Sequence, residues 1–347
     1  MIKIKLLEPQ IHRNETTFRP FLYAYNQLKE IGIEFTDGDS YDYAWVGQAS
    51  IIDKKKSLKE SISKGLEFIS KIDGDYMIID GQDSTSLIGT IDVFRESQAK
   101  LFLKNSYLKD FDLYKKGWAN GRMYWGEGDY SVPDIDNLKD RMKLTGCNWL
   151  STLQPKWLDY STIEKPYDIS CMFGYPTKEP VYEHDVCQTD YYDKHRKELL
   201  DILNETDYKI AKLEDGERLP IDQYYQKMAS SKIILAPLGY GEMAPRDIES
   251  SIFGSILIKP DLEYIDTKPN IFYPTKTGGE PATYVNVKYD WSDLIKKIDH
   301  TLRMYDEMRP FLVDNMKKQF KKLNTYENLA LHLYELFSKL DGVQTDE

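Results

Sequence analysis

Short apolar segments alternate with amphipathic helical segments along this chain, in two successive runs. In the first run, expected strands at 2–7, 44–46 and 76–80 are separated by expected helices at 18–31 and 57–72. Short links between strand, helix and strand require crossover connections, and such connections build a parallel sheet. The alternation therefore predicts an α/β fold.

The alternation restarts after a polar segment, 151–166, that contains two prolines, as domain linkers often do. The second run has expected strands at 167–173, 208–212, 232–237 and 255–259, and expected helices at 191–203, 221–230, 246–253, 291–305 and 309–340. The length of 347 residues also exceeds the roughly 250 that one hydrophobic core usually serves. We therefore expect two Rossmann-like α/β domains, at 1–158 and 166–310, that face each other across a cleft.

Charge and cysteine content exclude several classes of protein. The chain carries 46 Lys and Arg against 57 Asp and Glu, a formal net charge of −11. This charge repels polyanions, so we expect no nucleic-acid partner, although a local basic pocket for one phosphate ligand is compatible with it. No apolar run fits a signal peptide or a transmembrane segment. Three scattered cysteines, Cys147, Cys171 and Cys187, indicate a reducing compartment, and we expect a cytoplasmic protein of a bacterium or of a virus in its host cell.

The most informative segment runs from 230 to 260. Its first expected strand ends at Pro237, and the loop that follows contains Gly239, Tyr240 and Gly241. Glycines in such a loop let the backbone approach a ligand closely. In open α/β sheets the ligand lies beyond the carboxyl ends of the strands, which is where this loop must lie. The segment therefore predicts a ligand site.

Two charged residues, Arg246 and Glu249, begin the next expected helix. The first turn of a helix offers free N–H groups and the positive end of the dipole to a phosphate, and the planar fork of Arg246 can hold a diphosphate. Glu249 lies one turn later on the same face and suits the two hydroxyls of a ribose. The pair predicts a nucleotide-sugar site. The alternative is a surface ion pair worth about 0.2–0.5 kcal/mol.

The order Pro-x-Gly, Arg-x-x-Glu, a glycine five residues after the glutamate, and an apolar strand that ends in proline resembles the donor-domain motif of exostosin-like glycosyltransferases. The similarity covers about 166–310 and includes the entry strand that leads to Gly174 and the first helix, with Arg196. The resemblance implies a GT-B fold, in which two Rossmann-like domains face each other. It also implies a C-terminal helix, about 311–340, that crosses back to the first domain; one face of this helix is basic, with Lys317, Lys318, Lys321 and Lys322.

By this resemblance the chain is a hexosyl- or pentosyltransferase that moves a sugar from a UDP- or GDP-sugar to a glycan or glycoprotein acceptor. The resemblance implies inversion, with a base that deprotonates the acceptor hydroxyl, and no cofactor or metal, because the helix dipole and Arg246 would stabilise the leaving diphosphate. Retaining GT-B enzymes often carry two glutamates separated by seven residues, whereas six separate Glu242 and Glu249. Arg196 either reaches the diphosphate or lies solvated in the basic run 194–197.

The candidate catalytic base is Asp83, which follows the strand at 76–80 whose carboxyl end is expected to face the cleft. The alternative for Asp83 is a helix N-cap, and Asp80 is a rival base. Two Asp-Gly-Asp segments, 37–39 and 73–75, look like the Asp-x-Asp of metal-dependent transferases, but both precede strands, so we expect turns there and no metal site.

Aromatic residues flank a glycine-rich acidic segment, 126–129, in the loop-rich part of the first domain. Trp118, Tyr124 and Trp125 are expected either to stack on an acceptor sugar or to pack the loop. Two other functions stay open at this stage. One is a non-catalytic α/β protein that binds a nucleotide or a glycan, and the other is a transferase for modified DNA bases, against which the net charge argues.

Overall fold

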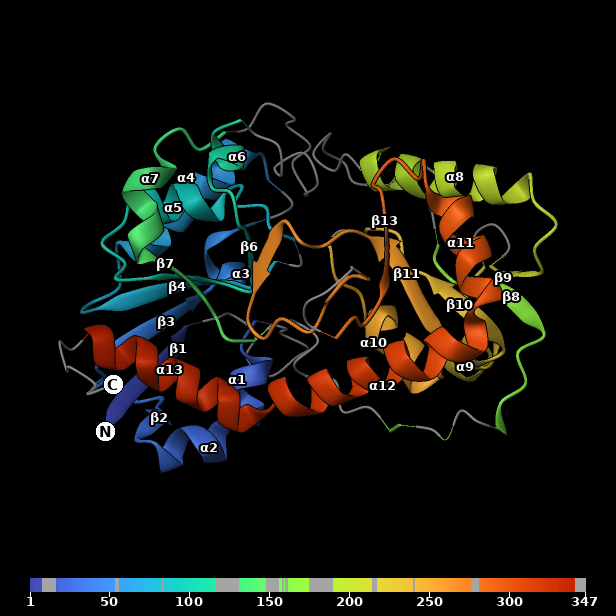
Figure 1. Cartoon of the computed structure of the whole chain (residues 1–347). Helices are drawn as coiled ribbons and strands as arrows, with labels where there is room; N and C mark the ends of the chain where they lie inside the picture. The colour runs from blue at the N-terminus through green and yellow to red at the C-terminus, as the bar shows by residue number, and fades with distance from the viewer. Residues whose placement is uncertain are drawn as a thin grey trace.

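The structure, a computed structural model, consists of two α/β halves, with the last helices running along both of them (Figure 1). It describes residues 1–7, 17–53, 56–82, 84–116, 131–147, 156–157, 159, 162–174, 190–213, 217–239, 241–275 and 281–340.

The first half is built on a parallel sheet with the strand order β2-β1-β3-β4-β5-β7. Its strands are β1 (Ile2–Leu7), β2 (Ile33–Phe35), β3 (Tyr43–Gly47), β4 (Tyr76–Asp80), β5 (Phe102–Lys104) and β7 (Met142–Leu144). Its helical elements are α1 (Arg19–Tyr23), α2 (Tyr25–Glu30), α3 (Gln48–Ile51), α4 (Leu58–Ile69), α5 (Thr90–Arg95), α6 (Asp112–Lys115), α7 (Ile135–Leu138) and the 3-10 helix η2 (Lys139–Arg141).

Both faces of this first sheet are buried. Successive residues of β3 and β4 enter opposite clusters: Val46 and Ile78 pack on one face, whereas Trp45 and Ile79 pack on the other. Parallel strands that are covered on both sides read as continuous apolar runs, as in β4, where every residue is buried. This is why β4 could be recognised in the sequence.

The second half repeats the design with the strand order β13-β11-β10-β8-β9, again parallel. Its strands are β8 (Tyr167–Cys171), β9 (Ile210–Lys212), β10 (Ser231–Leu235), β11 (Ile256–Pro260) and β13 (Val285–Val287). Its helices are α8 (Asp190–Asn204), α9 (Ile221–Ala229), α10 (Pro245–Ile252), α11 (Leu294–Arg303) and α12 (Tyr305–Leu323). In chain order the two sheets read 2-1-3-4-5-6 and 2-1-3-4-5, so both halves are doubly wound, Rossmann-like units. The predicted fold class is confirmed.

Among the described residues, a strand pair and the final helix link the two halves. β12 (Ile265–Thr267), from the second half, pairs antiparallel with β6 (Ser106–Leu108), from the first. The final helix, α13 (Tyr326–Leu340), returns to the first half, where Leu333 and Phe337 pack in the same cluster as Ile4 and Trp45 (Figure 1). The sequence did not predict β6 or β12, because three-residue strands leave little periodicity to detect.

The helix expected at 309–340 is in fact two helices, and the difference has a local cause. The Thr325 hydroxyl accepts a hydrogen bond from the Asn328 N–H at 3.1 Å and so caps the start of α13. α12 stays with the second half, where Met316 and Phe320 are buried beside Ile248. The return to the first half is therefore made by α13. The domain limits 1–158 and 166–310 stay predictions.

Other expected elements also differ from the structure. The helix expected at 18–31 is interrupted at Ala24, between α1 and α2. The segment 97–103 reads in the sequence as a strand, but the strand in the structure is β5 alone, and α5, just before it, was not predicted. By contrast, the residue type and position of Ser57 predict an N-cap, and Ser57 does cap α4: its side chain accepts the Glu60 N–H, and the Glu60 carboxylate accepts the Ser57 N–H in return.

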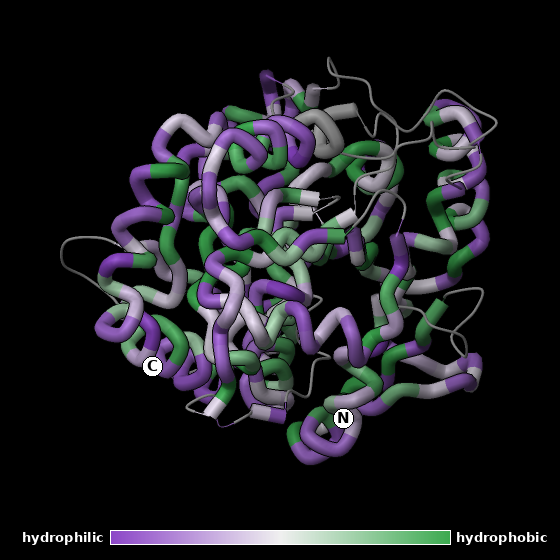
Figure 2. The backbone as a smooth tube through the Cα atoms, turned by 90° about the vertical axis from the view of Figure 1, so that its right-hand side faces the viewer, coloured by the Kyte–Doolittle hydropathy of each residue, from purple (hydrophilic) through white to green (hydrophobic). Residues whose placement is uncertain are grey.

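Hydropathy follows this architecture. Along the helices, short hydrophobic and hydrophilic stretches alternate within the turns (Figure 2), as expected for helices with one face on a sheet. Within the described residues, no helix combines the length and the apolar character needed to cross a bilayer.

Lys165, just before β8, gives the second half a pH-dependent stability. Its ammonium donates to the Phe253 carbonyl at 2.7 Å and to the Ser255 hydroxyl at 2.8 Å, and burial, helped by the charge of Arg309, lowers the pKa of Lys165 to about 7. Between pH 7 and about 10.4 the unfolded chain binds this proton more tightly than the folded one, so the contribution of Lys165 to stability rises with pH in that window.

Lys165→Met is expected to remove this contribution. The free energy of unfolding of the wild type, measured relative to the variant by urea denaturation, should rise between pH 7 and pH 10. A difference that stays constant over that range would contradict the depressed pKa.

Candidate functional site

The second sheet has a topological switch point between β8 and β10, because the chain leaves β8 toward β9 on one side and later enters β10 on the other. Ligands of doubly wound sheets bind outside the carboxyl ends of the strands at such a point. Two backbone segments end there, 172–174 after β8 and 236–239 after β10, and α10 begins a few residues later. The glycine loop that the sequence singled out therefore lies at the switch point.

A buried ion pair between Asp247 and Lys259 stabilises the start of α10. Pro245 occupies the first helical turn, and the Asp247 carboxylate accepts the Ala244 N–H at 2.8 Å. The Lys259 ammonium, on β11, contacts the same Asp247 carboxylate and donates to the Glu242 carbonyl at 2.8 Å. Asp247 and Lys259 are almost completely buried. This pair fixes both the loop and the first turn of the helix.

Arg246 presents an unsatisfied cation at this place. Its Nε and Nη1 atoms are buried and have no hydrogen-bond partner, and its guanidinium lies 5.8 Å from the centre of the Phe173 ring. A buried donor without a partner costs about 1–3 kcal/mol, and more when it is charged. No ion pair joins Arg246 to Glu249 in the described structure, so the surface-pair alternative is wrong. The guanidinium is arranged for an anion.

Arg196, on α8, converges on the same ring. Its guanidinium donates to the carbonyls of Gly174 at 2.5 Å and Leu238 at 3.2 Å, and lies 5.8 Å from the Phe173 ring centre. Two arginines thus share one aromatic ring at the ends of β8 and β10. The structure brings together Arg196, Gly174 and the glycine loop, which were predicted as separate donor-binding positions.

Gly239 leaves room for Arg196. A Cβ added at Gly239 would lie 2.7 Å from the Arg196 Nη2 atom, whereas a Cβ added at Gly174 meets nothing within 4 Å. The Gly239 N–H also donates to the Gly241 carbonyl at 3.1 Å, which closes the loop on itself.

Gly239→Ala is therefore expected to displace the Arg196 guanidinium without unfolding the protein, because the clash is with the end of a flexible side chain. Loss of one charged hydrogen-bonding group predicts roughly tenfold weaker binding of an anionic ligand, with little change in the melting temperature. Isothermal titration with nucleoside diphosphates measures the binding. Gly174→Ala should weaken binding less, and equal effects of the two variants would contradict this role of Gly239.

Glu249 is mostly buried beside Arg246. It accepts long hydrogen bonds from the hydroxyls of Tyr224, at 3.4 Å, and Tyr225, at 3.3 Å, both on α9. Burial raises the pKa of Glu249, and the charge of Arg246 opposes this shift. A carboxylate has about four acceptor positions, so two remain for hydroxyls of a ligand.

Glu242 has a different task from the one that a retaining pair would require. Its buried carboxylate accepts the Thr85 N–H at 3.1 Å and the Thr85 hydroxyl at 2.8 Å, and the Tyr114 hydroxyl donates to the Thr85 carbonyl at 2.8 Å. Thr85 belongs to the loop after β4 in the first half. Glu242 therefore joins the two halves, and it brings the carboxyl end of the first sheet against the glycine loop of the second.

In the first half, the rival base Asp80 is occupied. Its carboxylate pairs with the Lys104 ammonium at 3.2 Å and accepts the Thr90 hydroxyl at 2.5 Å and the Gln82 N–H at 2.8 Å. All of these groups are buried, so Asp80 organises the end of β4 rather than acting as a free base. Asp83, the predicted catalytic residue, lies outside the described residues.

Several other predicted positions also lie outside them, namely Tyr240, Trp118, Tyr124, Trp125 and Cys187. The Asp-Gly-Asp segment 73–75 directly precedes β4, whereas 37–39 lies between β2 and β3; Asp39 pairs with Lys5, and Asp75 with Lys100. Within the part of the chain that the structure describes, no three His, Cys, Asp or Glu side chains gather as a metal site.

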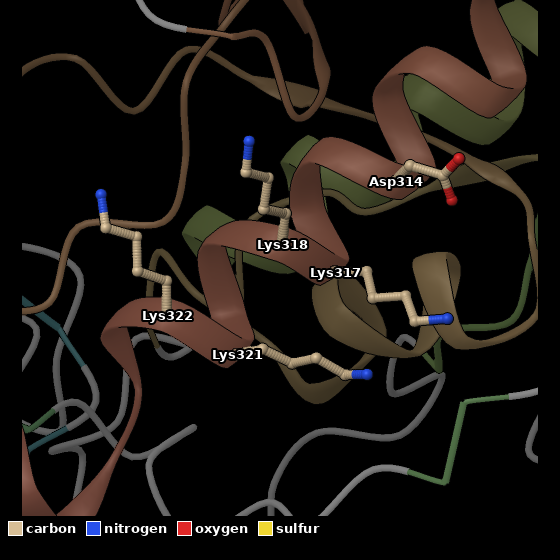
Figure 3. Close-up of a pocket in the computed structure, with 5 residues that line it drawn as sticks. All are labelled: Asp314, Lys317, Lys318, Lys321 and Lys322. Carbon is tan, nitrogen blue, oxygen red and sulfur yellow. The ribbon is translucent and has the colours of Figure 1, made fainter.

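The basic face of α12 forms an open trough of about 630 Å³ lined by Asp314, Lys317, Lys318, Lys321 and Lys322. Figure 3 shows that the ammonium groups diverge: those of Lys318 and Lys322 lie on one side of the helix, and those of Lys317 and Lys321 on the other. A single small anion cannot reach all four, so the trough does not rival the switch point as a phosphate site.

Sequence reasoning missed the residues that support the site from other elements. Phe173 was read only as the end of a strand, and Tyr224 and Tyr225 only as one turn of a helix. The adjacent Tyr224 and Tyr225, in the helix before β10, were the sequence feature that could have indicated this support. The Asp247–Lys259 pair left no signal in the sequence, because charged residues at 247 and 259 normally predict exposure.

No family model and no curated protein sequence matches the chain. Among solved structures, sucrose-phosphate synthase from Thermosynechococcus elongatus is similar over 99% of this chain and 100% of its own, with 10% identity and a TM-score of 0.49. The T4 phage protein BGT, in complex with UDP and Mn²⁺, is similar over 97% of this chain and 98% of its own, with 11% identity and a TM-score of 0.42.

A third similar structure is that of HepE from Anabaena in complex with UDP, which covers 98% of this chain and 100% of its own, with 10% identity and a TM-score of 0.40. None of the three is described as an exostosin, so the exostosin-like character stays a prediction. At these identities and TM-scores, the fold assignment rests on the two strand orders, and the function is argued from the residues of this chain.

Proposed function

We propose that this protein is a glycosyltransferase that uses a nucleoside-diphosphate sugar. The observation that carries the proposal is the pair of buried guanidinium nitrogens of Arg246, which lack hydrogen-bond partners at the switch point of the second sheet. A diphosphate supplies the acceptor oxygens that these donors need, and the first turn of α10 adds the positive end of a helix dipole.

The neighbouring groups fit the rest of such a donor. Glu249 lies one turn from Arg246 and keeps acceptor positions for the ribose hydroxyls, while Tyr224 and Tyr225 orient its carboxylate. The Phe173 ring and the Arg196 guanidinium border the same place. One anion-binding group and one hydroxyl-binding group, spaced by a helical turn, match a nucleoside diphosphate better than an isolated phosphate.

In the proposed reaction, the bond between the anomeric carbon of the donor sugar and the diphosphate oxygen breaks, and the nucleoside diphosphate leaves with the electron pair. A bond forms between the anomeric carbon and an acceptor hydroxyl oxygen, whose proton passes to a base. Asp83 stays the proposed base, and inversion stays the proposed stereochemistry. Arg246, Arg196 and the start of α10 neutralise the departing charge.

A glycan or glycoprotein stays the proposed acceptor, and UDP- or GDP-sugars the proposed donors. We also keep the expectation that the cations of the protein take the place of a metal, which an assay in the presence of EDTA checks directly. The alternative of a non-catalytic binding protein shares the donor site but lacks turnover.

Donor hydrolysis by water separates these functions. The wild-type protein is incubated with UDP-, GDP- and ADP-sugars, with and without EDTA, and release of the nucleoside diphosphate is measured. The proposal expects slow release from one class of donor, lost in Arg246→Ala and retained in Arg303→Ala, an exposed arginine on α11. Tight binding of a donor without any release, in the presence of glycan acceptors, would establish the non-catalytic alternative.

A further inference from the structure

Two glutamine side chains are buried at the carboxyl end of the first sheet, each with a polar atom that has no partner. Gln48 follows β3 and is 7% exposed, and Gln82 follows β4 and is 3% exposed. The Gln48 Nε2 and Gln82 Oε1 atoms are fully buried and make no hydrogen bond. Leaving such atoms unpaired costs about 1–3 kcal/mol each, a cost that a bound ligand can remove.

The two glutamines follow neighbouring strands of the first sheet. β3 and β4 are paired up to Gly47 opposite Ile79; Gln48, the first residue of α3, comes directly after Gly47, and Gln82 comes two residues after Asp80, the last residue of β4. Adjacent strands lie about 4.8 Å apart. The N–H of Gln82 donates to Asp80 at 2.8 Å, which fixes the start of the loop at the same point.

The orientation of the Gln82 amide is set by Asp80. The Gln82 Nε2 atom faces the Asp80 carboxylate at 3.5 Å, an acceptor-only group, so the Oε1 atom must point away from it. The two unpartnered atoms thus have opposite character: Gln48 offers a donor and Gln82 offers an acceptor. A hydroxyl group, which both donates and accepts, satisfies such a pair.

Among the residues that the structure describes here, the charges balance. Asp80 is paired with the buried Lys104, and Ser84, Thr85 and Ser86 are neutral and buried. This favours an uncharged, hydroxyl-bearing ligand over a phosphorylated one.

The position also fits the proposed reaction. The first sheet has its own switch point between β1 and β3, and Gln48 directly follows β3. Thr85 lies three residues after Gln82 and hydrogen-bonds to Glu242, which follows the glycine loop of the second half. This contact joins the carboxyl end of β4 to the loop that forms part of the proposed donor site.

We propose that Gln48 and Gln82 form the acceptor subsite and that it takes an uncharged sugar, one hydroxyl of which accepts from Gln48 and donates to Gln82. This inference rests on the proposed glycosyltransferase function and adds the chemical class of the acceptor.

The test uses Gln48→Met and Gln82→Met, which keep side-chain length and remove the hydrogen-bonding atoms, with Gln223→Met, an exposed glutamine on α9, as the matched control. Methyl glycosides of glucose, galactose and N-acetylglucosamine serve as neutral acceptors, and the corresponding sugar phosphates as charged ones. The ratio of sugar transfer to donor hydrolysis is expected to fall about tenfold in each variant and to stay at the wild-type value in the control. The KM for the neutral glycoside should rise more than kcat falls.

The melting temperature supplies a second readout. Gln48→Met replaces a side chain whose buried Nε2 atom is unpaired, so it should leave the melting temperature unchanged or raise it, whereas a large fall would show that Gln48 is structural. Wild-type transfer to sugar phosphates in preference to neutral glycosides, or unchanged transfer ratios in both variants, would also overturn the subsite.

Failure of the subsite and failure of the proposed function can be told apart. If the wild type releases no nucleoside diphosphate from any donor, the proposed function fails. Binding of the methyl glycosides, followed by saturation-transfer NMR, still tests the glutamines: binding lost in the Gln48→Met/Gln82→Met double variant supports the subsite, and binding that persists there overturns it.

Discussion

Arg246→Ala should lower turnover of the nucleotide sugar by about two to three orders of magnitude, the effect of removing one donor aimed at developing charge in a transition state. The buried Nε and Nη1 atoms of Arg246 have no other partner, so their loss is not compensated within the described structure. Arg246→Lys should recover part of the activity, because an ammonium supplies the charge without the planar fork. Product release from a saturating donor measures both variants.

The Arg246→Ala variant should not be less stable than the wild type in the absence of ligand. Removing a buried, unpaired cation relieves an unsatisfied group, so the melting temperature of Arg246→Ala should equal or exceed that of the wild type. Arg303→Ala, on the exposed face of α11, is the control. A substantial fall in melting temperature, together with normal turnover, would show that Arg246 is a structural residue.

Lys259→Met is expected to destabilise the protein by about 3–5 kcal/mol, because it leaves the buried Asp247 carboxylate without its cation. Asp247 and Lys259 are each at most 1% exposed, and burial lowers the pKa of Lys259, against the pull of Asp247. The double variant Lys259→Met/Asp247→Asn removes both charges and should recover most of the loss. Lys296→Met, an exposed lysine of α11, should change the free energy of unfolding by less than about 0.5 kcal/mol.

Chemical denaturation at pH 7 of the wild type and the three variants gives the free energies of unfolding. A double variant no more stable than Lys259→Met would show that the loss comes from packing of the lysine stem and not from the isolated carboxylate. Because the pair also holds the Glu242 carbonyl and the first turn of α10, a folded Lys259→Met protein should bind nucleoside diphosphates more weakly than the wild type.

Local patterns in the sequence were enough to predict the centre of the candidate site. The strand that ends near Pro237, the glycines after it and the arginine in the next helix all follow from residues close together in the chain, and the structure keeps this order from β10 through α10 to β11. The alternation of apolar strands and amphipathic helices similarly predicted two parallel sheets. In both cases the determining contacts are between neighbouring elements.

What could not be predicted depends on contacts between distant segments. Asp80 looked like a free carboxylate at a strand end, yet Lys104, on the next strand, neutralises it inside the core. Glu242 was weighed in the sequence only as one member of a retaining glutamate pair, with a spacing that did not fit, yet it binds Thr85, 157 positions away in the chain. Such pairings arise only when the two halves are in place, and a single sequence carries no pattern for them.

Equilibrium binding of nucleoside diphosphates tests the central claim, that Arg246 and the start of α10 form a donor site, most directly. Isothermal titration with UDP, GDP and ADP should reveal one nucleotide that binds the wild-type protein at least tenfold more tightly than it binds Arg246→Ala. Its affinity for Arg303→Ala should equal that for the wild type. If none of the three nucleotides binds the wild type, or if Arg246→Ala binds its preferred nucleotide equally well, the donor site is not where we place it.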